Sequence, residues 1–539
     1  MTNTYLTLKG VSHVLPDGTA LFSDLHEQFD MRPTGLVGRN GAGKTVLARI
    51  LAGLLPPTTG QCLCSGSVHY LAQQVAYDDG ATVAGLAGVK HTLDALARID
   101  AGSTAAADFD AVDGRWDMHQ RLHQALERND LGHLEAGTPA RTLSGGEAMR
   151  VALTGALLSG ADFLILDEPS NHLDRPNRQA LIEQLQRWPH GLIVVSHDRQ
   201  LLHAMERIVA LSSQGLRSYG GNYTFYARAR AHERQSALEQ LSQRKLERQR
   251  EEQALRKQDE RQARRQARGH RHGKKANQAK VLLDRQKERS ESSAGALRQK
   301  QAARRAQQDQ RVQAAAEHVE QAPGITLHDI PARHNAMDKR RTVDLDRVTL
   351  PFVPGATRHI TLALSGRQRI GVVGPNGCGK STLLRVLAGR ISPLSGTCKV
   401  TAERAGLDQR LGNLDPEKTV LEQLQLARRT ATEGDLRMRL AQLGLDAQKI
   451  ATPSGLLSGG ERLKGALACI LYADSPPQLL LLDEPNNHLD LPSVEALEAM
   501  LQRYPGTLVV VSHDDRFLDN LALTDRLLAT PQGWHLEPL

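Results

Sequence analysis

The sequence contains one ordered set of short motifs twice, and this repeat constrains the fold more than any other feature. "GLVGRNGAGKTVLARILAG" (35–53) returns as "GVVGPNGCGKSTLLRVLAG" (371–389), and "FLILDEPSNHLD" (163–174) returns as "LLLLDEPNNHLD" (479–490). "LSGGE" and "VVSHD" also occur once in each copy, in the same order relative to these motifs. Internal similarity of this kind predicts two copies of one domain.

A stretch rich in helix-forming residues separates the copies. Between 231 and 310 Pro is absent and Gly is scarce, while Gln, Arg, Ala, Leu and Glu dominate, so we expect two long helices. Gly269 and Gly273 lie between these helices and favour a turn. The predicted parts are a first domain over 1–226, a helical hairpin linker over 227–322 with its tip at 266–276, and a second domain over 323–539.

Positive charge is concentrated in this linker. Residues 231–310 hold 22 Lys or Arg against 11 Asp or Glu, whereas the net charge of the whole chain is +8. The stretch 261–280 contains no acid, and 231–351 contains no Phe, Tyr or Trp that could stack on bases. We therefore expect contact with phosphates of folded RNA, with DNA, a protein partner or a solvated spacer as alternatives. The predicted RNA-binding residues are Arg261, Arg264, Arg265, Arg268, Arg271, Lys274, Lys275 and Lys280.

Each copy contains a phosphate-binding loop between an apolar strand and an amphipathic helix. The pattern Gly-x4-Gly-Lys-Thr/Ser lets backbone N–H groups face phosphates, and the lysine can reach the β- and γ-phosphates. A Gln follows each loop lysine by 29 residues. The predicted ATP-binding residues are Gly38, Asn40, Gly41, Gly43, Lys44, Thr45 and Gln73, with Gly374, Asn376, Gly377, Gly379, Lys380, Ser381 and Gln409 in the second copy.

An acidic pair ends an apolar strand in each copy, and a histidine follows 30 residues after the first acid. The first acid and the hydroxyl after the loop lysine suit Mg2+, the second acid can orient a water, and the histidine can contact the γ-phosphate. The predicted metal ligands are Thr45, Asp167, Ser381 and Asp483. The predicted catalytic residues are Glu168, Glu484, His197 and His513.

Other classes of protein fit the sequence poorly. No run of eighteen apolar residues is present, and the N-terminus lacks the pattern of a secretory signal. The five cysteines have neither disulfide nor zinc-finger spacing. We therefore expect a cytoplasmic protein with reduced thiols.

Taken together and in order, the phosphate loop, "LSGGE", "LDEP", "HLD" and "SHD" resemble the ATP-binding cassette (ABC) ATPases. The resemblance implies two tandem ABC-type P-loop ATPase domains of α/β fold that use ATP and Mg2+ and face each other head to tail. The phosphate loop of one copy then meets the "LSGGE" signature of the other, and Asp174 and Asp490 lie across the seam. The implied signature residues are Ser144, Gly145 and Gly146 for the second site, and Ser458, Gly459 and Gly460 for the first.

Two cassettes on one chain, a charged helical linker, "NHLD" after each acidic pair and "YGGNYTFYARARAHERQ" at the exit of the first cassette resemble the ABC-F subfamily. This implies a monomeric ATPase without a membrane subunit. It would bind the ribosome when closed on ATP and release it on hydrolysis, its linker touching rRNA and the P-site tRNA near the peptidyl-transferase centre. A translation factor and an antibiotic-resistance protein both fit. A DNA-associated ATPase and the motor of a transporter are the alternatives.

Overall fold

The computed structural model describes residues 4–74, 77–78, 80–171, 173–275, 299, 302–316, 341–407, 414–487 and 489–539. The chain packs as two compact units. One unit combines Met1–Tyr226 with Ile325–Leu539 and contains both copies of the repeat, and the other is Ala227–Gly324. Within the described ranges, no helix is both long and apolar enough to cross a bilayer.

The first copy is built on a six-stranded sheet of order β5-β6-β7-β3-β8-β9, in which only β9 runs antiparallel to its neighbour. A three-stranded antiparallel sheet of order β2-β1-β4 accompanies it. The strands are β1 (Leu6–Val14), β2 (Ala20–Phe29), β3 (Thr34–Gly38), β4 (Thr59–Cys64), β5 (Val68–Leu71), β6 (Phe163–Asp167), β7 (Gly191–Val195), β8 (Arg207–Ser212) and β9 (Gly215–Gly220).

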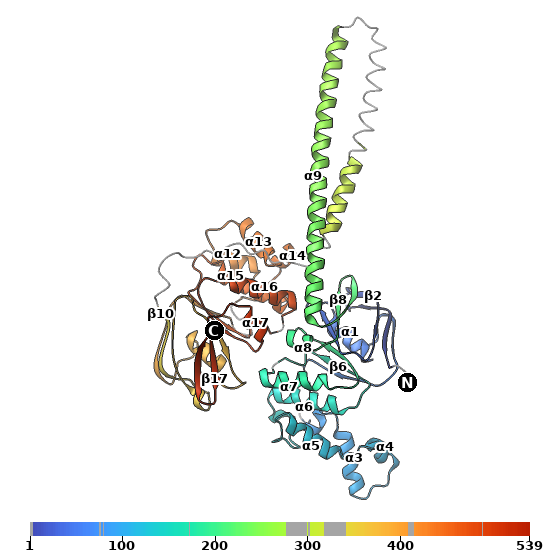
Figure 1. The fold of residues 1–539 in the computed structure, drawn as a ribbon, viewed down its shortest axis with the longest axis vertical. Helices are drawn as coiled ribbons and strands as arrows, with labels where there is room; N and C mark the ends of the chain where they lie inside the picture. Colours follow the sequence, from blue (N-terminus) through green and yellow to red (C-terminus); the bar gives the residue numbers. More distant parts are fainter. Residues whose placement is uncertain are drawn as a thin grey trace. The chain divides into compact units, whose positions relative to one another are not determined.

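The second copy repeats this topology, with sheet orders β14-β15-β16-β12-β17-β18 and β11-β10-β13 (Figure 1). Its parallel strands are almost entirely apolar, as expected where helices cover both faces of a sheet. The strands are β10 (Arg341–Thr349), β11 (His359–Ser365), β12 (Arg369–Val373), β13 (Ser395–Val400), β14 (Arg404–Leu407), β15 (Leu479–Asp483), β16 (Thr507–Val511), β17 (Asp525–Thr530) and β18 (Gly533–Pro538). The predicted tandem α/β fold is confirmed.

Helices connect the strands in the same order in both copies. In the first they are α1 (Lys44–Leu51), α2 (Val83–Leu86), α3 (Lys90–Asp100), α4 (Ala106–Val112), α5 (Met118–Arg128), α6 (Gly145–Leu158), α7 (Arg175–Gln186) and α8 (Arg199–His203). In the second they are α11 (Lys380–Leu387), α12 (Val420–Ala427), α13 (Glu433–Gln442), α14 (Ala447–Ile450), α15 (Gly459–Leu471), α16 (Leu491–Gln502) and α17 (Asp515–Asp519).

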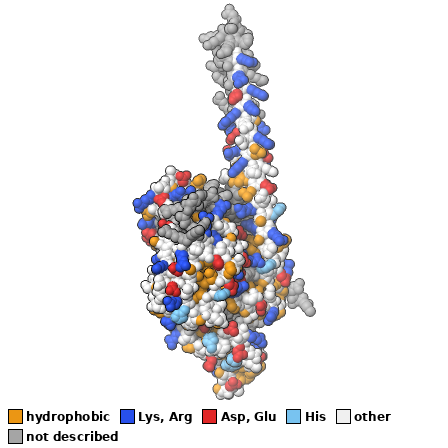
Figure 2. Space-filling model, turned by 60° about the vertical axis from the view of Figure 1, so that its left-hand side comes forward, with side chains coloured by type: hydrophobic (Ala, Val, Ile, Leu, Met, Phe, Trp, Pro, Cys, Tyr) orange, Lys and Arg blue, Asp and Glu red, His pale blue; other side chains and the backbone are white. Residues whose placement is uncertain are grey.

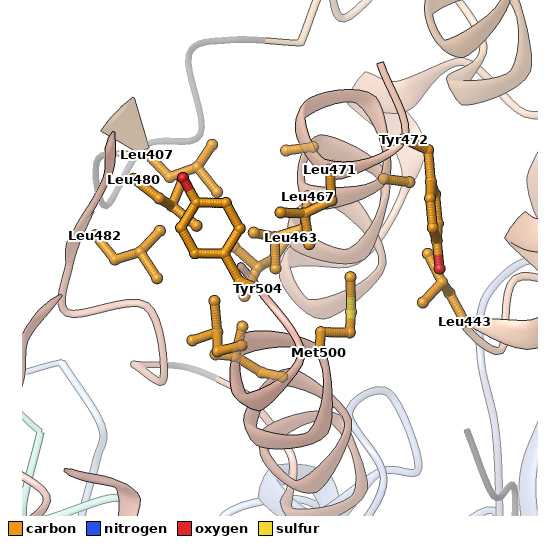
Figure 3. Packing of buried hydrophobic residues seen from close by; sticks show 14 of the residues in the cluster. Leu407, Leu443, Leu463, Leu467, Leu471, Tyr472, Leu480, Leu482, Met500 and Tyr504 are labelled. Atoms are coloured by element: carbon orange, nitrogen blue, oxygen red, sulfur yellow. The ribbon is translucent and has the colours of Figure 1, made fainter. Parts of the chain in front are cut away.

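Buried leucines fix the position of α15 in the second copy. Figure 3 shows Leu463, Leu467 and Leu471 on one side of this helix, facing Leu480 and Leu482 of β15 across the Tyr504 ring. Each side chain is almost fully withdrawn from water, and burial of one leucine contributes about 1.5–3 kcal/mol. This core therefore holds the start of α15, where the "LSGGE" motif lies, in a fixed relation to the sheet.

The second unit is dominated by helix α9, which spans Tyr223–Lys275. It continues through Gly269 and Gly273, so the prediction of a turn at these glycines is wrong. Residues 302–316 are also helical, and Arg248 of α9 lies 3.4 Å from Asp309 of this segment. Two helical segments therefore lie side by side in the linker, as a hairpin requires.

Candidate active sites

The phosphate loops follow strands β3 and β12 and lead into α1 and α11. Gly43 and Gly379, the residues before these helices, have φ angles of 93° and 99°. A Cβ atom at Gly43 would lie 2.5 Å from Cδ2 of Leu21, and one at Gly379 would lie 2.7 Å from Cγ2 of Val353. Only glycine fits at these two positions, and the unpaired N–H groups of the first helical turn remain available to a phosphate.

The loop lysines are folded back onto their own loops. Nζ of Lys44 donates hydrogen bonds of 2.9 and 3.0 Å to the carbonyls of Gly38 and Arg39. Nζ of Lys380 donates to Gly374 and Pro375, both at 2.8 Å. Both side chains are buried, and burial lowers the pKa of Lys44. Each lysine is thereby fixed as a positive charge at the centre of a loop.

The first acid of each pair lies where a divalent cation fits. The Asp167 carboxylate at the end of β6 is buried, which raises its pKa, and the hydroxyls of Thr45 and Tyr70 hydrogen-bond to it. In the described part of the chain, its Oδ1 atom has no hydrogen-bond partner. In the second copy, Asp483 and Ser381 line one cavity. A buried carboxylate beside a hydroxyl, with an oxygen unsatisfied, is the donor set that Mg2+ prefers.

The second acid of each pair has a strained backbone. Glu168 and Glu484 have φ angles of 50° and 48°, a left-handed conformation that is uncommon for residues other than glycine. Their N–H groups are held by the carbonyls of Val195 and Val511, at 2.8 and 3.0 Å. Strain kept identically in both copies points to function, because the surrounding contacts must compensate for its cost.

A histidine ring faces each of these glutamates. Nε2 of His197 lies 3.7 Å from Oε1 of Glu168, and Nε2 of His513 lies 3.5 Å from Oε1 of Glu484. Burial raises the pKa of Glu484 to about 7 and lowers that of His513 to about 4. The shifts at Glu168 and His197 have the same directions and the same cause. Each pair therefore combines a neutral imidazole with a carboxyl group that can accept a proton near neutral pH.

The two copies meet at their phosphate loops. The backbone N–H of Asn40 donates to Oδ2 of Asp490 at 3.0 Å, and that of Asn376 donates to Oδ2 of Asp174 at 3.1 Å. Although burial opposes it, these hydrogen bonds and those from the following helical turn hold the pKa of both aspartates below the usual value. The two aspartates therefore lie across the seam, as the resemblance implies.

A cavity of about 420 Å3 lies at the second site and is lined by both copies. The second copy contributes its phosphate loop, acidic pair and His513, together with Phe352, whose ring is 91% exposed. The first copy contributes Glu168 of its own acidic pair, residues that follow it, including Ser170, Asn171 and Arg178, and the loop at His197 and Asp198.

The signature residues cap their own helices in both copies. Ser144 and Glu147 form a capping box at the start of α6, and Ser458 and Glu461 form one at α15. Oγ of Ser144 donates to Oε2 of Glu147 at 2.7 Å. Neither Ser144 nor the two glycines after it are among the residues that line the cavity beside Lys380.

The other predicted residues are the two glutamines after the phosphate loops and the basic residues of the linker. Gln73 is half-buried just after β5, whereas Gln409 lies outside the described residues. In α9 the side chains of Arg261, Arg264 and Arg268 are exposed. Arg265, Arg271, Lys274 and Lys275 belong to the same helix, and Lys280 lies outside the described residues.

Two residues near the sites were missed from the sequence. Tyr70 donates to Oδ2 of Asp167 at 3.2 Å, and Arg178 of the first copy lies in the cavity of the second site. Each occurs in one copy only, so comparison of the two copies could not identify it. The position of Tyr70 in β5 is Gly406 in β14, and Val494 follows Asp490 as Arg178 follows Asp174.

Comparison with known families gives two matches along the chain. The model of the ABC transporter family matches residues 30–171 and 357–487, which are the two copies of the repeat. These matches begin before each phosphate loop and end within "NHLD", so they include all the catalytic residues predicted here except the two histidines.

Comparison with characterised proteins extends over nearly the full length. The chain is 32% identical over 517 residues to the energy-dependent translational throttle protein EttA of Mycobacterium tuberculosis, covering 90% of this chain and 84% of that protein. It is 29% identical over 523 residues to the ribosome protection protein VmlR of Bacillus subtilis, covering 95% and 85%. Among solved structures, an RNase-L Inhibitor matches with a TM-score of 0.57 and 18% identity, covering 98% of this chain and 90% of that one, which supports the fold.

Proposed function

Because this chain belongs to the ABC-F group of the ABC ATPases, we propose that it binds the ribosome while ATP holds its two cassettes closed, and releases it after hydrolysis. The reaction is ATP plus water to ADP plus phosphate. We place the protein in the cytoplasm as a monomer whose two cassettes pair within one chain.

The reciprocal hydrogen bonds between Asp174 and Asn376 and between Asp490 and Asn40 are the observation that carries this proposal. Each phosphate loop touches the other cassette through its own backbone. Nucleotide bound at a phosphate loop therefore affects the contact between the cassettes, and that contact in turn affects the conformation of the loop. Such coupling is what a switch between closed and open cassettes needs, because a ligand shifts a conformational equilibrium only through differential contacts.

For hydrolysis we assign the proton-accepting role to Glu168 and Glu484 and the γ-phosphate contact to His197 and His513. The raised pKa of Glu484, about 7, suits a group that orients a water and takes its proton. Lys44 and Lys380 would hold the β- and γ-phosphates, and Asp167, Thr45, Asp483 and Ser381 would hold Mg2+. The metal supplies positive charge that stabilises the phosphate oxygens.

The ribosomal partner is supported by the charge of α9 and by the names of the relatives. Figure 2 shows Lys and Arg side chains along the described length of this helix, and Arg261, Arg264 and Arg268 are exposed. At about 1.5 Å per residue, a helix of 53 residues is about 80 Å long, enough to reach deep into a large RNA particle. We propose that it contacts rRNA and tRNA near the peptidyl-transferase centre.

The double variant Glu168→Gln, Glu484→Gln tests this proposal. It keeps the shape of both sites and removes the proton acceptors, so ATP should bind and hold the cassettes closed. With ATP, the variant should migrate with ribosomes through a sucrose gradient of cell lysate, whereas wild type should dissociate. ATP-loaded variant at the top of the gradient would contradict the ribosomal role and direct the search to DNA or a membrane partner.

A further inference from the structure

The first turn of α7 brings a charged side chain of the first cassette into the second ATP site. Nη1 of Arg178 donates a 2.8 Å hydrogen bond to the backbone carbonyl of His513. Its Nε lies 3.0 Å from Oδ2 of Asp198, in its own cassette. The side chain is buried and lines the same cavity as Lys380 and Glu484.

Among the described residues, this contact has no counterpart in the first site. The helices α7 and α16 begin alike, because Asp174 and Asp490 cap them and each accepts a hydrogen bond from the opposite phosphate loop. Four residues further on, α7 has Arg178 where α16 has Val494, which is buried in the apolar core. The seam is therefore symmetric at the aspartates and asymmetric one helical turn later.

The position of Arg178 affects the groups expected to carry hydrolysis. By holding the carbonyl of His513, it fixes the loop that keeps the imidazole 3.5 Å from Glu484. Its guanidinium also places a fixed positive charge in the cavity that Glu484 lines. A fixed charge acts more strongly in a buried site than in water. Loss of the Arg178 guanidinium therefore changes both the position of the His513 loop and the electrostatic field at Glu484.

We propose that Arg178 is a positioning residue, supplied by the first cassette, on which hydrolysis at the second ATP site depends. Residue Val494 cannot do the same at the first site. The inference rests on the proposed ATPase activity and makes the two sites unequal: the second hydrolyses only while α7 of the first cassette is docked beside it.

The seam offers a matched control on the same helix. Arg175, one turn before Arg178, forms an ion pair of 3.1 Å with Asp515 of the second cassette. Its side chain is exposed and does not line the cavity. An exposed pair of this kind contributes little, about 0–1 kcal/mol. Arg175→Ala removes an arginine that bridges the cassettes without touching the site.

The experiment measures each site separately under single-turnover conditions with Mg2+ and ATP. Glu168→Gln leaves the second site active, and Glu484→Gln leaves the first. Arg178→Ala should lower the hydrolysis rate about 100-fold in the Glu168→Gln background, the usual effect of removing a positioned donor, with ATP affinity changed less than about threefold. In the Glu484→Gln background the rate should change less than twofold, and Arg175→Ala should be neutral in both.

Two further variants and a chemical rescue distinguish a positioning role of Arg178 from a role in folding. Arg178→Lys keeps a charge near Asp198 and should recover part of the rate, while Arg178→Met should not. Guanidinium in solution should increase the rate of Arg178→Ala in the Glu168→Gln background only, because the truncated side chain leaves space beside the cavity.

Equal loss of rate in both backgrounds, or the same loss with Arg175→Ala, would overturn the inference and make Arg178 a structural contact. Unchanged hydrolysis in the second site would also overturn it while leaving the proposed ATPase intact. If Glu168→Gln with native Arg178 binds ATP and hydrolyses none of it, the inference fails together with the proposed hydrolysis at that site.

Discussion

The backbone N–H of Asn376 donates a hydrogen bond to the carboxylate of Asp174, a residue 202 positions earlier in the chain. Asn40 and Asp490 form the same contact in the opposite direction. In both cases the other carboxylate oxygen caps the helix that follows, α7 or α16. One side chain thus links the start of a helix in one cassette to the phosphate loop of the other.

Replacing Asp174 with Asn should uncouple the seam and leave the fold intact. An amide has one acceptor oxygen, so it can cap α7 or accept from Asn376 but not both. We expect ATP turnover to fall several-fold and thermal stability to change by about 1 kcal/mol or less, the usual contribution of a helix cap. Turnover and melting temperature measure this, with Asp490→Asn as the symmetric partner. A large loss of stability without loss of turnover would contradict it.

Tyr70→Phe should strengthen Mg2+ binding at the first site alone. The hydroxyl of Tyr70 donates a hydrogen bond to Oδ2 of Asp167, an oxygen that Mg2+ could otherwise use. The equivalent position in the second copy is Gly406, which has no hydroxyl. Releasing one hydrogen bond of about 1 kcal/mol corresponds to about a fivefold lower Mg2+ requirement. Mg2+ titration of fluorescent nucleotide binding measures this in a Lys380→Ala background, which disables the second site. An unchanged or higher requirement would show that the hydroxyl does not compete with the metal.

The fold and most of each site were predictable from sequence because they are repeated. Strand, loop, helix and acidic pair recur in the same order in both copies, and the structure places them at equivalent strand ends. Arg178 and Tyr70 could not be found this way, since each occurs in one copy and acts through a contact distant in sequence. The capping role of Ser144 was visible in the pattern Ser-x-x-Glu, which is a helix start as well as a family signature.

The linker was predicted less well, for a physical reason. Glycine disfavours helix by only about 1 kcal/mol, and many flanking helix formers outweigh two such residues. Gly269 and Gly273 therefore lie within α9, where a turn was predicted. The low helix propensity of two glycines is therefore too small an effect to predict where a helix of 53 residues ends.

Breaking the buried ion pair that joins Arg199 and Glu498 across the cassettes should destabilise the protein strongly. Nη1 of Arg199, the first residue of α8, lies 2.5 Å from Oε1 of Glu498 in α16, and both side chains are almost fully buried. Glu498→Gln should cost about 3–5 kcal/mol, because it leaves a buried guanidinium without its counter-ion. Thermal or urea unfolding measures this. The double change Arg199→Met, Glu498→Leu should recover most of the loss, and failure to recover would argue against the pair as its cause.

Gly269→Ala, Gly273→Ala should stabilise α9. Because both residues lie within the helix, each change should favour it by up to about 1 kcal/mol, so helicity and its thermal persistence should rise in circular dichroism. Ala at both positions would instead disrupt a turn that needs left-handed glycine. Lower helicity would therefore restore the original prediction of a tip at 266–276, and Gly295→Ala provides a comparison outside this stretch.

Alkylation of Cys378 should inactivate the second site, and ATP should protect it. This half-buried thiol lies inside the phosphate loop, between Gly377 and Gly379, so an added group would crowd bound phosphates. Burial raises the pKa of Cys378, which keeps it as the unreactive thiol at neutral pH. The rate of modification by iodoacetamide should therefore keep rising above pH 9, while exposed Cys64 reacts first. Mass spectrometry of both peptides beside ATP turnover measures this; full turnover after complete modification of Cys378 would contradict it.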